Sequence, residues 1–273
     1  MSVDPRLRTL DIEIPTQPEV LVKLSLLMAA EDIDLLAMSS LVETDMALAA
    51  AVLKAVNSSM YGLRGRVQTV HQALTYLGMR EVAAITFEMG LRAAFPSAVE
   101  LDPVWKRAAL RGIMMGRMGQ MLGVDPWAAH SAGLFEECGK AVLYRHAPAH
   151  YPAMLRAAVR DVDLVQLEHV AFGVSHDALG AALCESWGLG PAAVASVRHH
   201  VEVQSTRIMP EILQRRGVSA ISTLAWCLLH HPELLEEVAH DIAPQASLDE
   251  TLVLRAARRV IEQMATAQER PRG

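Results

Sequence analysis

Aromatic residues and cysteines are scarce in this sequence, and both shortages restrict the fold. Phe, Trp and Tyr together make up 4% of the 273 residues, although hydrophobic residues as a whole make up 52%. Aromatic and β-branched residues concentrate in strands, so an apolar share carried mainly by Ala, Leu, Val and Met favours helices. The three cysteines, Cys138, Cys184 and Cys227, form no CxxC pair, which argues against a zinc ribbon or a disulfide framework.

Long apolar runs are also missing. The most apolar stretch, from Gly112 to Val124, is interrupted by Arg117 and Gln120 and is shorter than the roughly 18–20 residues of a membrane-spanning helix. The first fifteen residues contain acidic side chains and no apolar core, unlike a signal peptide. We therefore expect a cytoplasmic protein without membrane insertion.

The sequence also has few clusters of Lys and Arg. The chain has 25 Lys and Arg against 31 Asp and Glu, a net charge of −6, whereas nucleic-acid binding requires clustered Lys and Arg. Arg64, Arg66 and Arg80, with Tyr61 nearby, form the one basic segment that could bind nucleic acid, and we expect it to be a solvated loop. Neither GxxxxGK[ST] nor GxGxxG occurs, so nucleoside triphosphate hydrolysis is disfavoured.

Helix boundary signals are what the sequence has in abundance. Asp45 can cap a helix that begins at Met46, because its carboxylate can accept from the first backbone amides. Thr69 can cap a helix that Gly78 ends, and Asp125-Pro126 can open another that runs to about Cys138. No strand alternation with hairpin signals is present. The sequence predicts an all-α fold.

The division of the chain is indicated by two prolines, Pro96 and Pro103, in a segment without helical periodicity. We expect two helical lobes that meet there. The predicted boundaries are an N-terminal extension, an N-terminal lobe, a C-terminal lobe and a frayed tail, at residues 1–11, 12–96, 97–268 and 269–273.

Two longer stretches and two short ones carry a resemblance to a known family. They read AVLKAVNSSMYGLRGRVQTVHQALTYLG at 51–78, AGLFEECGKAVL at 132–143, GVSHDALG at 173–180 and VRHH at 197–200. Together they resemble the HDOD domain, the HD-related output domain of bacterial signalling proteins, over roughly residues 12–235. Its signature loop corresponds here to Asn57, Ser58, Tyr61 and Gly62, for which we expect structural roles.

The resemblance implies an all-helical, two-lobed, HD-like fold in a protein that is non-catalytic and regulatory. Its partners would be signalling proteins, often of cyclic-di-nucleotide or chemosensory pathways. In a catalytic HD domain, a helical His, an adjacent His-Asp pair and a distant Asp hold a metal ion. The matching positions hold Arg107 and Glu136-Glu137, and arginine has no lone pair to donate. The resemblance therefore implies a vestigial pocket without catalytic residues, metal or cofactor, made of Arg107, Glu136, Glu137, Lys140, His176, His199 and His200.

Two arrangements of this pocket remain open at the sequence level. In the first, Arg107 forms an ion pair with Glu136 or Glu137, one of the two Glu points to solvent, and His176 and His199 close the pocket. In the second, Arg107 and the Glu pair all face water. The alternative function is a metal-dependent phosphohydrolase with altered ligands, Glu136, Glu137, His176 and His199.

Overall fold

The computed structural model of the chain describes residues 12–28, 34–58, 67–211 and 216–269, and every regular element in these ranges is a helix. The fold class predicted from the sequence is confirmed. In chain order the elements are α1 Glu19–Met28, α2 Leu35–Glu43, α3 Met46–Val56, α4 Val70–Leu77, α5 Met79–Ala93, η2 Val99–Leu101, α6 Asp102–Leu122, α7 Pro126–His146, α8 Tyr151–Ala157, α9 Asp161–Phe172, α10 His176–Ser186, α11 Pro191–Thr206, α12 Gly217–His230, η3 Pro232–Leu234, α13 Leu235–Ile242, η4 Pro244–Ala246 and α14 Glu250–Glu269.

The chain divides into two compact units. Of the described residues, the N-terminal unit contains those from 16 to 94 together with 261–269, and the C-terminal unit contains 12–15 together with those from 95 to 260. The assignment of residues 261–269 to the N-terminal unit is not indicated by the sequence. In the C-terminal unit, Trp187 Nε1 donates to Pro15 O at 2.9 Å, which attaches the segment before α1 to this unit.

The predicted helix caps are present where the structure describes them. The Asp45 carboxylate accepts from the backbone N–H groups of Ala47 and Leu48, and Thr69 Oγ1 accepts from Gln72 N. Asp125 accepts from the first-turn amides of α7 in the same way. These bonds satisfy amides that have no partner within the helix, so the short polar side chains set where the helices begin.

Asn57 ties the end of α3 to the segment before α4. Its Nδ2 donates to Leu53 O at 2.9 Å and to Val67 O at 2.8 Å, while its Oδ1 accepts from Val67 N at 3.2 Å. These bonds agree with the structural role expected for Asn57, and Ser58 follows it in the turn. Other residues of the predicted loop and basic segment, namely Tyr61, Gly62, Arg64 and Arg66, lie outside the described residues. Arg80 is exposed on α5.

The core of the N-terminal unit forms around α5, which packs against α1, α2, α3 and α4. One face of α1 buries Leu21 and Leu24, and α5 buries Phe87. The approach of α1 and α5 is close at Gly90, where an added Cβ would lie 2.6 Å from Leu21 Cδ2. Packing of these amphipathic faces holds the short helices together.

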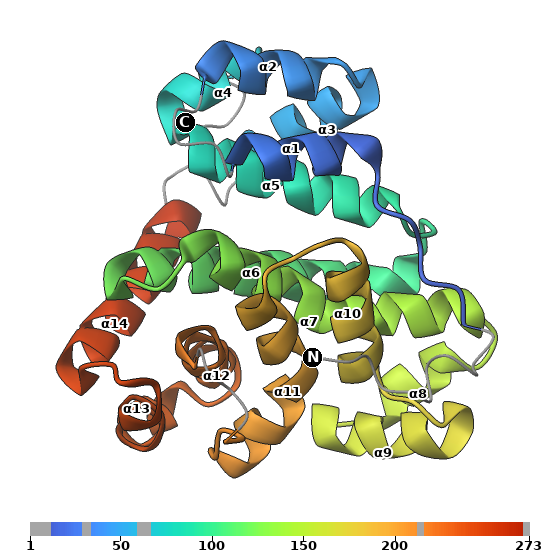
Figure 1. The fold of residues 1–273 in the computed structure, drawn as a ribbon, viewed down its shortest axis with the longest axis vertical. Coiled ribbons are helices and arrows are strands. Elements are labelled where there is room, and N and C mark those ends of the chain that lie inside the picture. Colours follow the sequence, from blue (N-terminus) through green and yellow to red (C-terminus); the bar gives the residue numbers. More distant parts are fainter. Residues whose placement is uncertain (1–11, 29–33, 59–66, 212–215, 270–273) are drawn as a thin grey trace. The chain divides into compact units, whose positions relative to one another are not determined.

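The C-terminal unit forms around α7, which packs against α6, α10, α11 and α12 (Figure 1). Every residue of α7 from Ala129 to Leu143 is buried. The helix continues to His146, well past the end predicted near Cys138, because neighbouring helices cover it on all sides and no breaking residue occurs before Pro148.

Glycines allow the closest helix contacts of α7. An added Cβ on Gly133 would lie 2.8 Å from Gly112 N on α6, and one on Gly139 would lie 1.8 Å from His176 O on α10. Backbone atoms cannot move aside as a flexible side chain can, so these positions require glycine. The segment between Gly133 and Gly139 is thereby held between α6 and α10.

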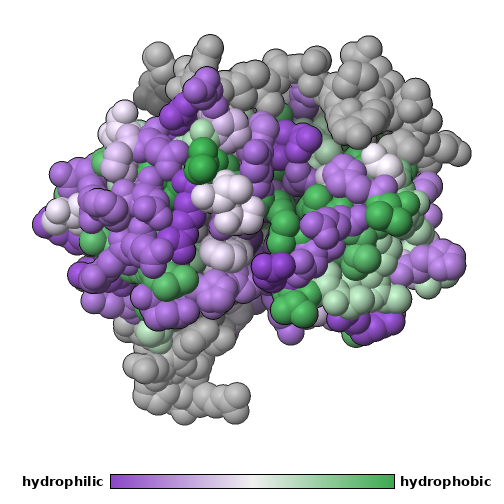
Figure 2. All heavy atoms as spheres, turned by 90° about the horizontal axis from the view of Figure 1, so that it is seen from below, coloured by the Kyte–Doolittle hydropathy of each residue, from purple (hydrophilic) through white to green (hydrophobic). Residues whose placement is uncertain are grey.

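The surface of the protein carries hydrophobic and hydrophilic side chains together (Figure 2). The face in Figure 2 mixes the two classes of residue, with hydrophobic side chains scattered among hydrophilic ones. Among the described helices, none alone has the length and apolarity to cross a membrane; α2 and α3 together, bent by 114°, meet that test of length and composition.

Substitution of Gly139 by Ala should destabilise the protein strongly, because the new Cβ would overlap the backbone of His176. We expect a loss of about 3 kcal/mol or more in the free energy of unfolding, measured in urea. Gly190→Ala is the matched control, since Gly190 has a negative φ of −63° and no atom within 4 Å of an added Cβ. Its cost should stay below about 1 kcal/mol. Equal effects of the two substitutions would contradict the close contact of α7 and α10.

Candidate functional site

Glu136 and Glu137 are both buried in the centre of the C-terminal unit. Their relative exposures are 0% and 1%, and they lie on α7 between the two glycine contacts. The prediction that one of the two points to solvent is wrong, because α7 is covered on every side and both side chains enter the core. Two buried carboxylates need close cations or hydrogen-bond donors.

Two arginines of α6 supply positive charge to this pair. Arg111, which is 1% exposed, forms an ion pair with Glu136, and its Nη1 lies 3.8 Å from Glu137 Oε1. Arg107 binds Glu137 Oε2 through Nη2 at 3.2 Å and Nε at 3.3 Å. The structure therefore has the first of the two arrangements considered for Arg107. The sequence analysis missed Arg111, although it lies four residues after Arg107 on the same helix face.

Lys140 extends the cluster from α7 to α9. Its Nζ lies 3.1 Å from Glu137 Oε2 and 2.8 Å from Asp161 Oδ1, and the side chain is almost completely buried. Burial by itself would lower the pKa of Lys140, but Asp161 and Glu137 raise it above its ordinary value. The ammonium group is thus charged at neutral pH. We call Arg107, Arg111, Lys140, Glu136 and Glu137 the ion-pair cluster.

The electrostatics of Glu137 follow from the same contacts. Burial would raise the pKa of Glu137, but Lys140, Arg107 and Arg111 outweigh it and lower the pKa to about 2. Burial likewise would raise the pKa of Asp161, and Lys140 followed by His176 lowers it well below its ordinary value. Both carboxylates are ionised over the whole physiological pH range.

His176, the first residue of α10, is held by a buried carboxylate from α9. Its Nδ1 and its backbone N each lie 2.8 Å from Glu168 Oε2, and Tyr151 Oη donates to the other oxygen of Glu168. Burial would lower the pKa of His176, but Glu168 raises it. Among the described residues, Nε2 of His176 is buried and has no hydrogen-bond partner.

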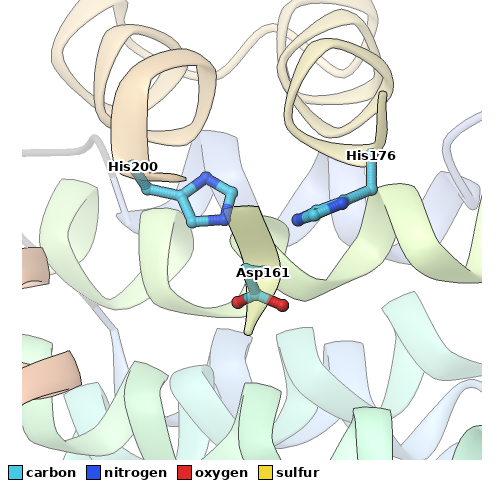
Figure 3. A group of neighbouring side chains, drawn as sticks. All are labelled: Asp161, His176 and His200. Atoms are coloured by element: carbon cyan, nitrogen blue, oxygen red, sulfur yellow. The ribbon is translucent and has the colours of Figure 1, made fainter. Parts of the chain in front are cut away.

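His200 on α11 and Asp161 on α9 lie beside this unpartnered nitrogen. The rings of His176 and His200 have centroids 5.5 Å apart, and one ligand atom from each of the two histidines and Asp161 lies within 4.8 Å of the others. The two rings face each other, and the Asp161 carboxylate lies below them in the view of Figure 3. His200 Nδ1 lies 2.7 Å from Val197 O, and burial lowers the pKa of this imidazole. We call Asp161, His176 and His200 the imidazole–carboxylate cluster.

The structure does not bring His199 into either cluster. Its Nδ1 lies 3.3 Å from Glu202 Oε2 on the partly exposed side of α11. The expectation that His199 closes the pocket is corrected to His200, because consecutive residues of a helix point about 100° apart. The sequence analysis also missed Asp161 and Glu168, whose spacing of seven residues places both on one face of α9.

A cavity of about 710 Å³ opens next to both clusters. Its lining includes Arg107, Glu137, Lys140, Asp161 and Trp226. Cavities of this size accommodate small molecules, and convergent charged groups with perturbed pKa values are typical of binding sites. The cavity lets solutes approach these four charged side chains.

Removal of the Arg111 guanidinium should leave Glu136 as an unpaired buried charge. We expect Arg111→Met to lower the free energy of unfolding by about 3–5 kcal/mol, measured in urea. The double variant Arg111→Met with Glu136→Leu should recover much of this loss, since no buried charge is then unpaired. Arg258→Met is the control, because Arg258 and Glu236 form an exposed pair and its loss should cost less than about 1 kcal/mol. A small effect of Arg111→Met would refute the buried pair.

The lowered pKa of Glu137 predicts a loss of stability in acid. Its pKa is about 2 in the folded protein and 4.5 in the unfolded chain, so the stabilisation is complete above about pH 4.5 and is lost as the pH falls toward 2. The full contribution is about 3 kcal/mol. Urea unfolding between pH 7 and pH 3 should show a shallower acid slope for Glu137→Gln than for the wild type. The exposed Glu236→Gln should keep the wild-type slope; parallel slopes for all three proteins would contradict the prediction.

Solved structures with the same architecture include three bacterial proteins. A protein of proposed signal-transduction function from Marinobacter aquaeolei VT8 is 24% identical with a TM-score of 0.72, over 98% of this chain and 62% of that chain. An HDOD domain protein of unknown function from Geobacter sulfurreducens is 19% identical with a TM-score of 0.71, over 97% and 95%. A protein of proposed phosphohydrolase function from Shewanella amazonensis SB2B is 19% identical with a TM-score of 0.67, over 96% and 97%. At these identities the likeness shows the fold.

The sequence comparisons agree with the fold. An uncharacterized protein of Treponema pallidum is 26% identical over 196 residues, which cover 69% of this chain and 37% of that relative. The chain thus spans little more than a third of this relative's length. Residues 14–203 match the HDOD domain family, and because this match covers most of the chain, the protein belongs to the HDOD domain family.

Proposed function

We propose that this HDOD domain is a non-catalytic signal-transduction module that acts by binding a protein or a small molecule. The observation that carries the proposal is the ion-pair cluster, in which the Arg111, Arg107 and Lys140 side chains compensate the buried Glu136 and Glu137. The resemblance to HD enzymes implies that Arg107 and Glu136-Glu137 stand at positions where those enzymes hold their metal ion. Here protein cations take the place of the ion's charge.

The ion-pair cluster does not fit a catalytic metal. Guanidinium and protonated ammonium groups have no lone pair to donate to an ion. A divalent ion placed among the buried Arg111 and Lys140 and the half-buried Arg107 would also meet strong repulsion, because the surrounding protein screens charge poorly. We therefore derive no hydrolytic step through a metal ion at Glu136 and Glu137.

The cavity beside the clusters supports a binding role. Its volume of about 710 Å³ suits a small ligand, and Trp226 offers an aromatic surface there. The neighbour from Marinobacter aquaeolei is of proposed signal-transduction function, and a role with signalling proteins of cyclic-di-nucleotide or chemosensory pathways belongs to the same proposal.

A metal-dependent phosphohydrolase is the alternative, and the imidazole–carboxylate cluster favours it. The Glu136, Glu137, His176 and His199 ligand set considered from the sequence has no support in the geometry, because His199 bonds to Glu202. If this protein were a metal-dependent enzyme, its metal ligands would have to be Asp161, His176 and His200 instead.

Hydrolysis of bis(p-nitrophenyl) phosphate separates the two functions. The full chain should hydrolyse it no faster than a buffer blank in the presence of Mg²⁺, Mn²⁺ or Zn²⁺. The matched control is Asp161→Asn, which removes a carboxylate of the alternative site. Hydrolysis that is metal-dependent and is lost in Asp161→Asn would overturn the non-catalytic proposal.

A further inference from the structure

Beyond the proposed function, we propose that Asp161, His176 and His200 bind one divalent transition-metal ion of the Zn²⁺ class. This site lies next to the ion-pair cluster and does not use Glu136 or Glu137. The proposal revises the expectation from the sequence that no metal binds.

The unpartnered nitrogen of His176 is the first observation that points to a ligand. His176 is completely buried, and among the described residues its Nε2 makes no hydrogen bond. Burying a polar nitrogen without a partner costs free energy, and such groups in folded proteins usually have an unseen partner. Here Asp161 and His200 lie around the place that a partner would take (Figure 3).

The hydrogen bonds behind the two rings prepare their Nε2 atoms for a metal. Nδ1 of His176 can donate to Glu168 Oε2, and Nδ1 of His200 can donate to Val197 O. Each ring with its hydrogen on Nδ1 has a lone pair on Nε2. Metal-binding histidines commonly show this arrangement, in which a carboxylate or backbone carbonyl fixes the tautomer and the orientation of the ring.

The distances and ligand types select the class of ion. Zn²⁺ binds imidazole nitrogen at about 2.0–2.1 Å, so two ligands of one ion lie at most about 4.2 Å apart. The three ligand atoms are within 4.8 Å of one another, so a small adjustment of the partly exposed Asp161 side chain would bring them to this spacing. Two imidazoles with one carboxylate suit Zn²⁺ and its neighbours, whereas Mg²⁺ and Ca²⁺ prefer oxygen ligands.

The local charge permits a cation here although Lys140 is close. Lys140 contacts Asp161 through Oδ1 and keeps Glu137 as a second partner, so it stays paired if Asp161 turns toward the ion. In the described network around the two clusters, carboxylates outnumber side-chain cations by one. The carboxylates are Glu136, Glu137, Asp161, Glu168 and Asp177, and the cations are Arg107, Arg111, Lys140 and Arg198.

The cavity reaches one ligand of the site. Asp161 lines the 710 Å³ cavity, so an ion from solution can approach this carboxylate. Three protein ligands leave at least one position of a tetrahedral ion open. A bound ion would therefore add a positive charge beside the proposed ligand-binding cavity.

Metal binding to the full chain tests the proposal. The protein is first dialysed against a chelator, and Zn²⁺ is then titrated in by calorimetry. We expect one equivalent per chain, a rise of a few degrees in the melting temperature at saturating Zn²⁺, and visible absorption of tetrahedral Co²⁺ in a parallel titration. Asp161→Asn and His200→Gln should each weaken Zn²⁺ binding at least tenfold.

His199→Gln is the matched control, because His199 is adjacent to His200 and bonds to Glu202 outside the cluster. It should bind Zn²⁺ as the wild type does. Circular dichroism and the metal-free melting temperature establish whether each variant is folded. If His200→Gln does not fold, Asp161→Asn still tests the site, because Asp161 is partly exposed and its substitution is less disruptive. Absence of binding, or binding that Asp161→Asn leaves unchanged, would overturn the site. Neither result affects the proposed non-catalytic function, which metal-dependent hydrolysis alone would refute.

Discussion

The burial of two adjacent carboxylates, Glu136 and Glu137, is the constraint on which the C-terminal unit depends. A buried carboxylate is tolerated only with close opposite charge or hydrogen bonds. Two adjacent buried carboxylates therefore need about twice as many compensating groups. Arg111 and Arg107 from α6 and Lys140 from α7 meet it. The elements that supply these cations must then keep a fixed register with α7. A hydrophobic core tolerates small shifts, whereas ion pairs at hydrogen-bond distance do not, and this makes the register specific.

The glycines of α7 explain how such a register is possible. Gly133 lets α6 approach within backbone contact, and Gly139 does the same for α10, with the two glutamates between them. Larger residues would separate the helices and lengthen the ion pairs between α6 and α7. The same contact at Gly139 places the first turn of α10, and with it His176, beside Asp161. Close packing and charge compensation are therefore two results of one helix arrangement.

The two clusters differ in what they can do. In the ion-pair cluster, Glu136, Glu137 and the neighbouring Asp161 compensate the charges of three cations, so the cluster serves stability and shape. In the imidazole–carboxylate cluster, His176 Nε2 has no hydrogen-bond partner among the described residues, and Asp161 lines the cavity. A domain that has a compensated core beside an open binding position is suited to sensing a ligand, because binding can change the charge of the cavity without disturbing the core.

Much of the architecture follows from local sequence. Asp45, Thr69 and Asp125 mark helix starts because capping is decided within three residues, and the HDOD motifs identify the family. Contacts between distant segments could not be predicted in this way. That Arg111 binds Glu136, that Asp161 and Glu168 of α9 join the site, and that His200 and not His199 faces His176 depend on the rotation and register of packed helices. A change of one residue turns a helical side chain by about 100°, so only the tertiary structure decides which of two adjacent histidines enters the site.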